Sequence, residues 1–472
     1  MTDMPTAPAV PAPVFSPALL QQLEINGPRY TSYPTADRFH EGFDASAYAG
    51  TLAARVELSR HRSAAPLSLY VHIPFCESVC YYCACNKVIT KHHERAAEYL
   101  QALDVEIGLH RRALGAPQAV SQLHFGGGSP TFLSDAELAG VMASLQGAFE
   151  FTPDAERSIE VDPRTVDAGR LATLRQLGFN RISFGVQDFD PAVQKAVHRE
   201  QSEAMVRTLV EHARALGFTS INTDLIFGLP LQTPASFART VEQIVALRPD
   251  RIALYAYAHL PSRFKPQRRI VPAELPLAAA RVQMLQGALV GFLGQGYRYI
   301  GMDHFALPDD ALAVAQQQGK LHRNFQGYTT QPDSDLIGLG VSAIGGVGAS
   351  YAQNAKTLPE YYAALTQGRF AVVRGIALDA EDLLRRDVIM ALMCQGRVDF
   401  AAIEAAHAVA FSSHFAPELA RLARYAEMGL VRAGPRSIEV TPTGWFFVRV
   451  LAMAFDAALA AEVPRERFSR VI

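Results

Sequence analysis

The feature that most restricts the fold of this chain is a regular alternation of short apolar segments with longer helical segments between residues 66 and 260. The short segments are rich in β-branched and aromatic residues, as buried strands are. Six of them follow in order: LSLYVHI (67–73), SQLHF (121–125), SIEV (158–161), RISFGV (181–186), INTDLIF (221–227) and RIALYAYA (251–258). Strands joined through helices pair in parallel with right-handed crossovers, so the alternation predicts a βα-repeat sheet.

Local signals support the repeat. Ser134 and Glu137 form a capping-box pattern that begins a helix, and Thr233 with Pro234 begins another. The segments LGFNRIS and LGFTSIN, which start at Leu177 and Leu216, each read as a helix end, a glycine turn and a new strand. After residue 260 the alternation becomes irregular. We therefore predict an α/β fold with a partial, open (βα)6 barrel rather than a closed barrel of eight units.

The chain of 472 residues exceeds one ordinary core and predicts two or three domains. The formal net charge of −2 gives no general electrostatic reason to expect nucleic acid. No apolar run approaches the roughly 20 residues of a membrane span, and the N-terminus does not read as a signal peptide. Five cysteines, four of them in one place, make a poor disulfide framework, so we expect a reducing cytoplasm.

Those four cysteines lie within HIPFCESVCYYCACNK (72–87), directly after the first predicted strand. Cys76, Cys80, Cys83 and Cys85 have the spacing C-x3-C-x2-C-x-C, and Cys394 is the only other cysteine. Thiolates suit zinc or iron–sulfur clusters. Structural zinc usually takes two short pairs of ligands, and no second pair lies downstream. The spacing therefore favours a cubane cluster that has three thiolate ligands and a fourth iron left open.

C-x3-C-x2-C with an aromatic residue before the third cysteine resembles the radical S-adenosylmethionine (SAM) superfamily. The segments YVHIPFC, GVQDF, DLIFGLP, GMDHFA and HRNFQGYTT, with the extra x-C-N-K, narrow the resemblance to the oxygen-independent coproporphyrinogen III oxidases, also called coproporphyrinogen dehydrogenases. It runs from RYTSYPT (29–35) to the terminal FSRVI.

The resemblance implies an oxidoreductase of porphyrin and haem biosynthesis that uses a [4Fe-4S] cluster with one open iron site and two SAM molecules. By resemblance Cys76, Cys80 and Cys83 hold the cluster, and Cys85 lies near it without being a ligand. The implied reaction converts two propionates of coproporphyrinogen III to vinyl groups through a 5′-deoxyadenosyl radical and gives protoporphyrinogen IX. A monomer in the cytoplasm is expected, with an electron donor of flavodoxin-like or similar kind and no nucleic acid or membrane partner.

Residues at predicted strand ends are the candidates for SAM binding. Gly126–Gly128 follows the second strand and Glu160 ends the third, where parallel α/β folds bind ligands. By resemblance the first SAM contacts Tyr70, Gly127, Glu160 and Ile344, and the second contacts Tyr82, Gly128, Ser129, Gln187, Arg199, Asp224 and Ala258. Tyr82 and Ser129 stand where phenylalanine and threonine are common in the family. Taken alone, Gln187 or Asp224 is explained equally well by SAM binding and by membership of a structural polar network.

Carboxylates of the substrate call for forked cations, for which arginine is best suited. The candidates are Arg29, Arg263, Lys265, Arg268, Arg269 and Arg323. The four cations between residues 263 and 269 are explained equally well as parts of a solvated loop and as substrate ligands. The histidines His72, His259 and His304 read as packed residues, since the implied reaction requires no histidine base.

The predicted organisation is an N-terminal extension (1–60) with a mobile Pro/Ala tail (1–15) and a segment (29–35) that could cover the substrate, then the radical SAM domain (61–372). Residues 373–472 read as helices followed by a hairpin, a winged-helix-like unit. It lacks a dense basic stripe, so we interpret it as a packing or lid domain. Two alternatives stay open, a haem-trafficking relative without oxidase activity and a zinc-stabilised DNA binder.

Overall fold

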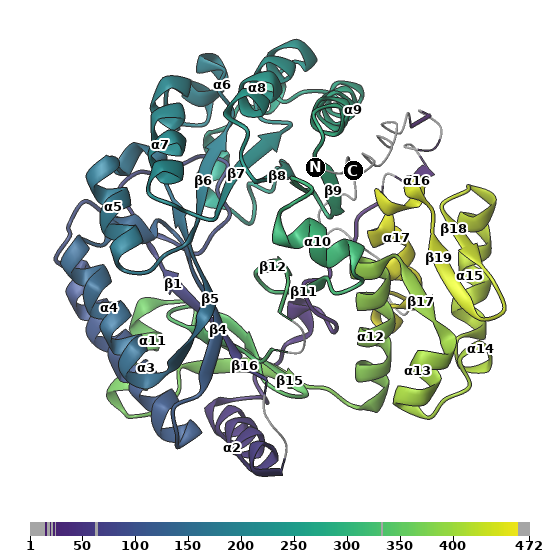
Figure 1. Ribbon diagram of the computed structural model, residues 1–472, viewed down its shortest axis with the longest axis horizontal. Coiled ribbons are helices and arrows are strands. Elements are labelled where there is room, and N and C mark those ends of the chain that lie inside the picture. The colour runs from purple at the N-terminus through teal and green to yellow at the C-terminus, as the bar shows by residue number, and fades with distance from the viewer. Residues whose placement is uncertain are drawn as a thin grey trace, which may run out of the picture.

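The computed structural model describes residues 15–460 except 17–18, 20–21, 24, 62–64 and 332–333. The predicted tail at 1–15 therefore lies outside the described residues apart from Phe15. That ring is buried, and it packs edge-on against Phe446 at 5.4 Å and Phe447 at 5.1 Å between ring centroids. Figure 1 shows a large curved sheet with outer helices, and beside it a smaller, mainly helical region coloured yellow-green to yellow.

The six predicted strands are present and adjacent, and each pairs in parallel with the next. They are β1 (Leu67–Ile73), β4 (Ala119–Gly127), β5 (Glu150–Val161), β6 (Arg181–Gln187), β7 (Ser220–Phe227) and β8 (Arg251–Ala256). The prediction of a parallel βα-repeat sheet is confirmed. Because all six run the same way, their carboxyl ends meet at one edge of the barrel.

Helices cover the outer face of these strands, as Figure 1 shows. They are α3 (Arg95–Leu114), α4 (Asp135–Ala148), α5 (Ala168–Gln176), α6 (Pro191–Ala196), α7 (Glu203–Ala215), α8 (Pro234–Leu247) and α9 (Ala278–Gly294). Helix α4 begins with the predicted capping box, in which the backbone N–H of Ser134 donates to Glu137 at 2.7 Å and that of Glu137 to the Ser134 hydroxyl at 3.3 Å. Helix α8 begins with a second such box, at Thr233.

Further strands extend the sheet on both sides and leave it open. Beyond β1 lie β13 (Leu336–Leu339), which is parallel to it, and the antiparallel β14 (Ile344–Gly346), β15 (Ser350–Asn354) and β16 (Val372–Ala377). Beyond β8 lie β10 (His304–Ala306), which is antiparallel to β8, and then β9 (Arg298–Gly301), which is antiparallel to β10. The twelve-stranded order begins with β16 and ends with β9, so the barrel is partial, as predicted.

The C-terminal region combines helices with a small antiparallel sheet. The helices are α12 (Ala380–Gln395), α13 (Phe400–His407), α14 (Phe411–His414), α15 (Ala416–Glu427), α16 (Pro442–Trp445), α17 (Val448–Ala452) and α18 (Ala457–Ala460). The sheet has the order β17 (Arg397–Asp399), β19 (Ser437–Val440) and β18 (Val431–Ala433). The predicted hairpin is thus β18–β19. Two bonds to backbone carbonyls tie α12 to the barrel side, from Tyr328 to Met393 at 2.8 Å and from Gln395 to Leu321 at 2.7 Å.

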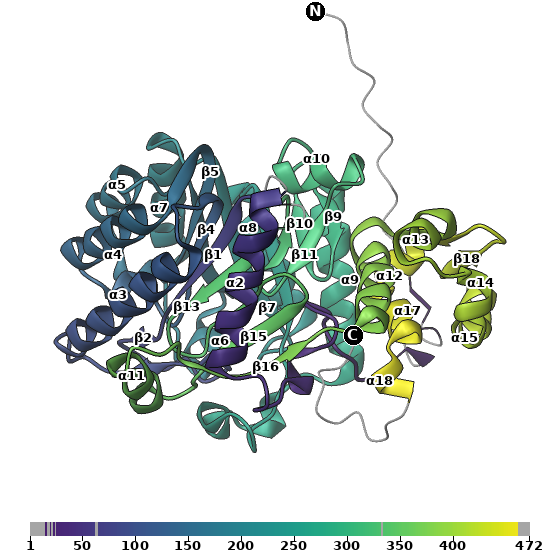
Figure 2. The ribbon, with the colours of Figure 1, turned by 90° about the horizontal axis from the view of Figure 1, so that it is seen from below.

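The remaining elements cover the edges. These are α2 (Ala45–His61), α10 (Ala311–Gln317), α11 (Leu358–Thr366), the hairpin β11 (His322–Asn324) and β12 (Gly327–Thr329), the short pair β2 (Phe75–Cys76) and β3 (Val88–Ile89), and 3-10 turns at Ala36–Arg38, Pro130–Phe132, Pro163–Thr165, Lys265–Arg269, Pro272–Glu274 and Met453–Phe455. Figure 2 shows α2 crossing the barrel side of the molecule, with the C-terminal helices at the opposite end. Across the described residues no helix is both long and apolar enough to span a membrane.

Residues 27–35, which we call the strap, run between the barrel and the C-terminal region. The buried Arg449 on α17 donates to the carbonyls of Gly27 and, at 2.8 Å, of Pro28. The buried Tyr30 hydroxyl donates to Asp456 at 2.9 Å. Strand β11 contributes Arg323, whose Nε donates to the Tyr30 carbonyl at 3.2 Å. The strap therefore joins the first described part of the chain to the last.

Candidate active site

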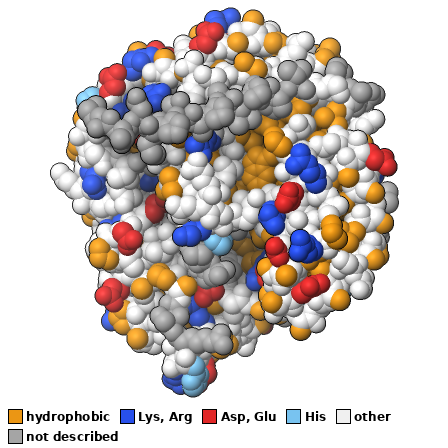
Figure 3. Space-filling view, turned by 45° about the vertical axis from the view of Figure 1, so that its right-hand side comes forward, with side chains coloured by type: hydrophobic (Ala, Val, Ile, Leu, Met, Phe, Trp, Pro, Cys, Tyr) orange, Lys and Arg blue, Asp and Glu red, His pale blue; other side chains and the backbone are white. Residues whose placement is uncertain are grey.

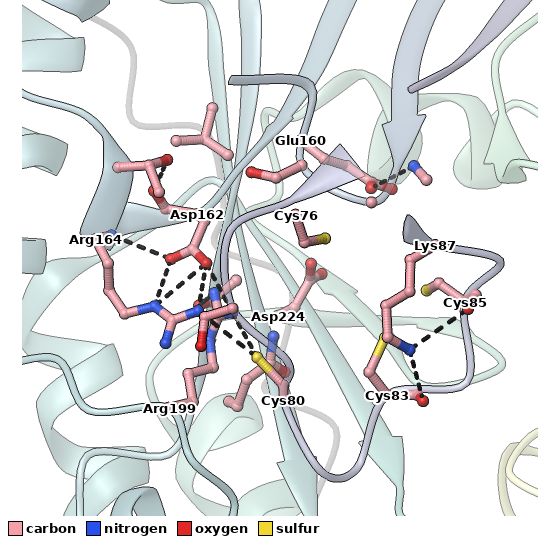
Figure 4. A pocket seen from close by; sticks show the side chains of 18 of the residues that line it. Cys76, Cys80, Cys83, Cys85, Lys87, Glu160, Asp162, Arg164, Arg199 and Asp224 are labelled. Atoms are coloured by element: carbon pink, nitrogen blue, oxygen red, sulfur yellow. Dashed lines mark hydrogen bonds and ion pairs between the residues drawn. The ribbon is translucent and has the colours of Figure 1, made fainter. Parts of the chain in front are cut away.

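A pocket of about 410 Å³ lies at the carboxyl ends of the parallel strands. The loop after β1 contributes all four clustered cysteines to its lining. The strand ends contribute Gly127, Glu160, Gln187 and Asp224. Figure 4 shows the cysteine loop on one side of this space and the acidic side chains beside it. In Figure 3 the surface is visibly hollowed, with hydrophobic side chains inside the hollow and charged ones around it.

The cysteine loop is closed at its base by two short strands. β2 and β3 pair in parallel, with Phe75 opposite Val88 and Cys76 opposite Ile89. The Thr90 N–H donates to the Cys76 carbonyl at 2.9 Å, and the Cys83 N–H donates to the Cys80 carbonyl at 3.2 Å in a turn. Backbone bonds thus fix the loop, and its thiols are free of disulfides.

The surroundings of the thiols fit soft metal ligands. Burial raises the pKa of Cys76 to about 12, so its thiolate needs a cationic partner. A hydrogen bond from Cys85 and the nearby Lys87 ammonium lower the pKa of Cys83 to about 5. At Cys80, the Arg199 Nη1 and Arg164 Nη2 atoms lie 3.4 Å and 3.6 Å from Sγ. Three thiols that line one pocket beside cationic side chains are a donor set that fits an iron–sulfur cluster.

Within the described residues, no set of three His, Cys, Asp or Glu side chains is arranged to hold a single metal ion. Cys85 is the most exposed of the loop cysteines, and Cys394 is buried in α12 away from them.

Asp162 connects the two arginines at Cys80. It follows β5 and accepts from Arg164 Nη2 at 2.6 Å and from Arg199 Nη1 at 3.1 Å. Although burial opposes ionisation, these guanidinium groups hold the pKa of Asp162 below its usual value. Figure 4 shows the three side chains together beside Cys80. One carboxylate therefore orients two cations toward the sulfur of a single candidate ligand.

The glycines after β4 allow the backbone to approach the pocket closely. Gly127 has a φ of +112°, and a Cβ there would lie 2.6 Å from the His72 ring. A Cβ on Gly128 would lie 2.7 Å from the Phe75 and Pro74 carbonyl oxygens. Neither position can hold a larger residue without displacing β1 or the cysteine loop. Because no side chains stand there, the backbone itself borders the pocket.

Glu160 lies between this backbone and a histidine. Its carboxylate accepts from the Gly127 N–H at 3.2 Å and lies 3.4 Å from His124 Nε2. Burial opposes its ionisation, but the bond with His124 and the one from Gly127 lower the pKa of Glu160 overall. With its side chain 44% exposed, the carboxylate is charged and can accept from an ammonium or a hydroxyl. His124 also stacks on Tyr70, with ring centroids 5.9 Å apart.

Gln187 and Asp224 come from the next two strand ends. Gln187 has a φ of +69°, uncommon for a residue with a side chain, and lies at a register shift between β6 and β7. Asp224 accepts from Asn222 Nδ2 at 2.9 Å and from the Ser183 hydroxyl at 3.3 Å. Burial, and then the charge of Glu160, raise the pKa of Asp224 to about 6.

The structure brings most of the predicted SAM residues together. The pocket is lined by Tyr82, Gly127, Gly128, Ser129, Glu160, Gln187, Arg199 and Asp224. Three others, Tyr70, Ala258 and Ile344, are not part of its lining. The Tyr70 hydroxyl bonds His72 Nδ1 at 3.0 Å, the Ala258 carbonyl accepts from Gln267 at 3.2 Å, and Ile344 begins β14. Gln267 also donates to the Tyr82 carbonyl at 3.0 Å, which joins two of the predicted contacts.

The three histidines that we interpreted as packed residues each have a hydrogen-bonding partner. None of these partners is an acidic or basic side chain of the pocket. His72 Nε2 bonds the Asn86 carbonyl at 3.0 Å, and burial lowers the pKa of His72. His259 bonds the Tyr257 hydroxyl at 2.9 Å, and His304 bonds the Met302 carbonyl at 2.8 Å.

The six candidate cations occupy two separate places. Arg263, Lys265, Arg268 and Arg269 lie on the exposed loop after β8, where Arg269 lies over the Tyr81 ring at 5.2 Å. Arg29 is on the strap and Arg323 on β11, across the barrel opening.

Sequence reasoning did not identify Asp162, Arg164, Lys87 or Tyr255, which also line the pocket. A signal for the first two was present, because EVDPRT places them directly after the strand that ends with Glu160. The end-of-strand argument that selected Glu160 applies equally to them.

Comparison with known proteins agrees with this geometry. Residues 70–244 match the family model described as the radical SAM superfamily, and residues 378–447 match the HemN C-terminal domain. The chain is 50% identical to the oxygen-independent coproporphyrinogen III oxidases of Salmonella typhimurium, over 455 residues, and Pseudomonas aeruginosa, over 457 residues. Each alignment covers 96% of this chain and 98% of the relative.

A solved structure agrees as well. The coproporphyrinogen III oxidase HemN from Escherichia coli, described as a radical SAM enzyme, superimposes with a TM-score of 0.89 at 47% identity. The match covers 94% of this chain and 99% of that one. The cysteine loop, the strand-end pocket and these near-complete alignments together show that the chain belongs to the family of oxygen-independent coproporphyrinogen III oxidases.

Proposed function

We propose that this protein carries out the oxygen-independent oxidative decarboxylation of two propionate side chains of coproporphyrinogen III, which gives protoporphyrinogen IX in haem biosynthesis. The observation that carries the proposal is the pocket itself, which is lined by the clustered thiols, by the bare backbone after β4 and by the carboxyl groups of Glu160 and Asp224. Near-complete relatives named for this activity support it.

Cys76, Cys80 and Cys83 would hold a [4Fe-4S] cluster and leave one iron open to SAM, and the two groups together would supply the one-electron radical chemistry that the reaction needs. Lys87 donates to the Cys83 carbonyl at 3.0 Å and, with Arg164 and Arg199, provides positive charge around the thiolates. Cys85 is proposed to lie beside the cluster without binding it, in keeping with its hydrogen bond to Cys83.

The polar groups of the pocket are proposed to hold SAM at two adjacent positions. Glu160 is ionised and suits an ammonium or ribose hydroxyls of the first molecule, next to the backbone of Gly127. Gln187, Arg199 and Asp224 come from the next strands and suit the second molecule. Two molecules match two reacting propionates, each of which loses a β-hydrogen, one further electron and CO2.

The rest of the chain is proposed to enclose this chemistry. We divide the chain into three domains. These are an N-terminal extension (1–60), a radical SAM domain (61–372) and a C-terminal domain (373–472) that packs against the barrel opening through α12. We propose that the protein acts as a monomer in the cytoplasm with a small protein electron donor. The substrate carboxylates are proposed to bind among Arg29, Arg323 and the cations between 263 and 269.

The test is anaerobic turnover after reconstitution with iron and sulfide. Dithionite, SAM and coproporphyrinogen III are supplied, and 5′-deoxyadenosine and the vinyl product are measured together. Both should form, and Cys76→Ala should abolish both while Cys85→Ala retains iron and sulfide. Deoxyadenosine without vinyl product would overturn the substrate, and neither product with tight haem binding would indicate a trafficking role.

A further inference from the structure

Three arginines from distant parts of the chain meet near the barrel opening: Arg29 on the strap, Arg323 on β11 and Arg449 on α17. Burial and the repulsion of Arg29 lower the pKa of Arg449 to about 9, and Arg323 adds to the repulsion. The carboxylates beside them are Asp303 and Asp456. Asp456 already accepts from the Tyr30 hydroxyl and from the Ala458 N–H at 3.0 Å. Within the described residues, three arginines thus gather near the carboxylates of Asp303 and Asp456.

Two of the three guanidinium groups bind the backbone of the strap. Arg449 donates to the Gly27 and Pro28 carbonyls, and Arg323 donates to those of Tyr30 at 3.2 Å and Arg29 at 3.4 Å. They hold Tyr30 in the left-handed region, with a φ of +45°. This conformation is costly unless the surroundings fix it. Arg323 and Arg449 are therefore positioning residues, and they fix the direction in which the side chain of Arg29 leaves the strap.

Arg29 forms an ion pair with Asp303 that solvent can reach. The Arg29 side chain is 34% exposed and that of Asp303 is 29% exposed. Asp303 lies in the tight turn between β9 and β10, where Met302 and Asp303 both have positive φ. Its carbonyl accepts from the Leu254 N–H on β8 at 2.7 Å, so the turn is fixed to the sheet. The pair therefore joins two rigid segments and remains open to a competing carboxylate.

The aromatic ring of Tyr255 connects the Arg29–Asp303 pair to the pocket. The Arg29 guanidinium lies over the Tyr255 ring, with 5.6 Å between its carbon and the ring centroid. Tyr255 lines the pocket together with Asp224 and Glu160. A tetrapyrrole carries its carboxylates around a wide ring, so one at the pocket leaves others within reach of the barrel opening.

On these grounds, and resting on the function proposed above, we propose that Arg29 binds a propionate carboxylate of the substrate that is not reacting. Asp303 occupies the place of that carboxylate in the substrate-free protein and is displaced when the substrate enters. Asp303 accepts from Arg29 Nη2, and a substrate carboxylate can take two parallel hydrogen bonds from a guanidinium, so the exchange replaces one ion pair with another. Asp303 thereby prevents an unpaired cation from facing the pocket and weakens substrate binding by competition.

The two partners of the pair should have opposite effects, which a purely structural ion pair would not show. Arg29→Gln removes the guanidinium that would bind the substrate carboxylate, so it should raise the KM for coproporphyrinogen III about tenfold to a hundredfold. Arg29→Lys should recover part of the loss. Asp303→Asn removes the competitor and should lower KM about threefold, because the pair is partly exposed. Arg60→Gln breaks the exposed ion pair with Glu57 on α2 and is the matched control.

The experiment combines anaerobic turnover of the reconstituted enzyme with a binding assay. Coproporphyrin III, the oxidised tetracarboxylate, is titrated by fluorescence quenching beside its tetramethyl ester, which has no carboxylates. Arg29→Gln should weaken binding of the acid and leave the ester unchanged. Asp303→Asn should tighten binding of the acid only.

Unchanged KM in active Arg29→Gln enzyme, or unchanged or weaker acid binding in Asp303→Asn, would overturn the proposal. If Arg29→Gln does not fold, the change in KM and in acid binding caused by Asp303→Asn decides by itself whether the proposal holds. Failure of the wild-type enzyme to form vinyl product would overturn the proposed function instead, so the two failures are distinguishable.

Discussion

At the scale of single residues, the two acids Glu160 and Asp224 of the pocket differ in how readily they ionise. Glu160 is ionised through the bond with His124, whereas burial and the charge of Glu160 raise the pKa of Asp224 to about 6. Ser183 and Asn222 donate to Asp224 but do not offset this. A bound cation such as SAM would favour its carboxylate form. Glu160 on β5 and Asp224 on β7, with β6 between them, thus differ in pKa because their surroundings differ.

Asp224→Asn should therefore stabilise the SAM-free protein in a pH-dependent way. Below about pH 4 the Asp224 carboxyl is protonated in both the folded and the unfolded states. As pH rises toward 6 only the unfolded chain loses the proton, so the wild type loses stability. The variant should be more stable by about 2 to 3 kcal/mol at pH 8, and the gap should close toward pH 4. Urea unfolding at several pH values measures this, and a gap independent of pH would contradict it.

Arg164→Gln should make the cluster harder to reduce. Arg164 donates to the Cys80 sulfur at 3.6 Å, and such donors stabilise the more negative, reduced cluster. Loss of one bond of about 1 kcal/mol corresponds to roughly 40 mV toward negative potential. A redox titration followed by electron paramagnetic resonance measures the shift. Arg239→Gln, whose side chain is 64% exposed, should leave the potential unchanged. Equal potentials in both variants would show that the Arg164 contact has no electronic effect.

At the scale of elements, the parallel strands were predictable because each is a short apolar run with clear ends. Strand β13 was not, because LIGL has four residues, one of them glycine, and its parallel partner β1 lies far away in the sequence. The cysteines, the glycines and Glu160 were found because each lies at or directly after the end of a predicted strand. The Arg29–Asp303 pair was beyond sequence reasoning, since 274 positions separate the two residues.

The segment after β13 depends on one buried side chain of α3. Glu106 accepts from the Gly340 N–H at 2.6 Å, from Asn354 on β15 at 2.6 Å and from the Tyr361 hydroxyl on α11 at 2.7 Å. Its own side chain is 1% exposed, and burial raises the pKa of Glu106 to about 7. One carboxyl thus holds three elements around the strand that begins with Ile344.

Glu106→Ala should consequently lower the free energy of unfolding by about 3 kcal/mol or more, because three buried donors lose their acceptor. Urea denaturation measures this. The control is Glu98→Ala on the exposed face of the same helix, which should change stability by less than about 0.5 kcal/mol. Similar values for the two variants would show that the Glu106 contacts contribute nothing net.

At the scale of the whole molecule, the strap lies between the barrel and the C-terminal region and contacts both. Tyr30, Arg323, Arg449 and Asp456 form a chain of hydrogen bonds that crosses from one region to the other. The barrel opening is therefore bordered by residues from both ends of the described chain.

Arg449→Met keeps the aliphatic stem but removes the donors to the Gly27 and Pro28 carbonyls. Amide hydrogen exchange in residues 27–35 should then become about tenfold faster or more, since charged donors contribute about 1.5 to 3 kcal/mol each. Arg436→Met, on the exposed β18–β19 hairpin, should leave exchange there unchanged. Equal protection in the two variants would mean that the strap is held by its other contacts.

The strap also has a consequence for how the protein is made. Tyr30 and Asp456 are 426 positions apart, and Arg449 lies 422 positions from Gly27. A ribosome produces the strap long before its partners on α17 and beyond. The parallel barrel can assemble in the meantime from its consecutive units. Residues 27–35 must therefore wait for the synthesis of more than 400 further residues before these contacts exist.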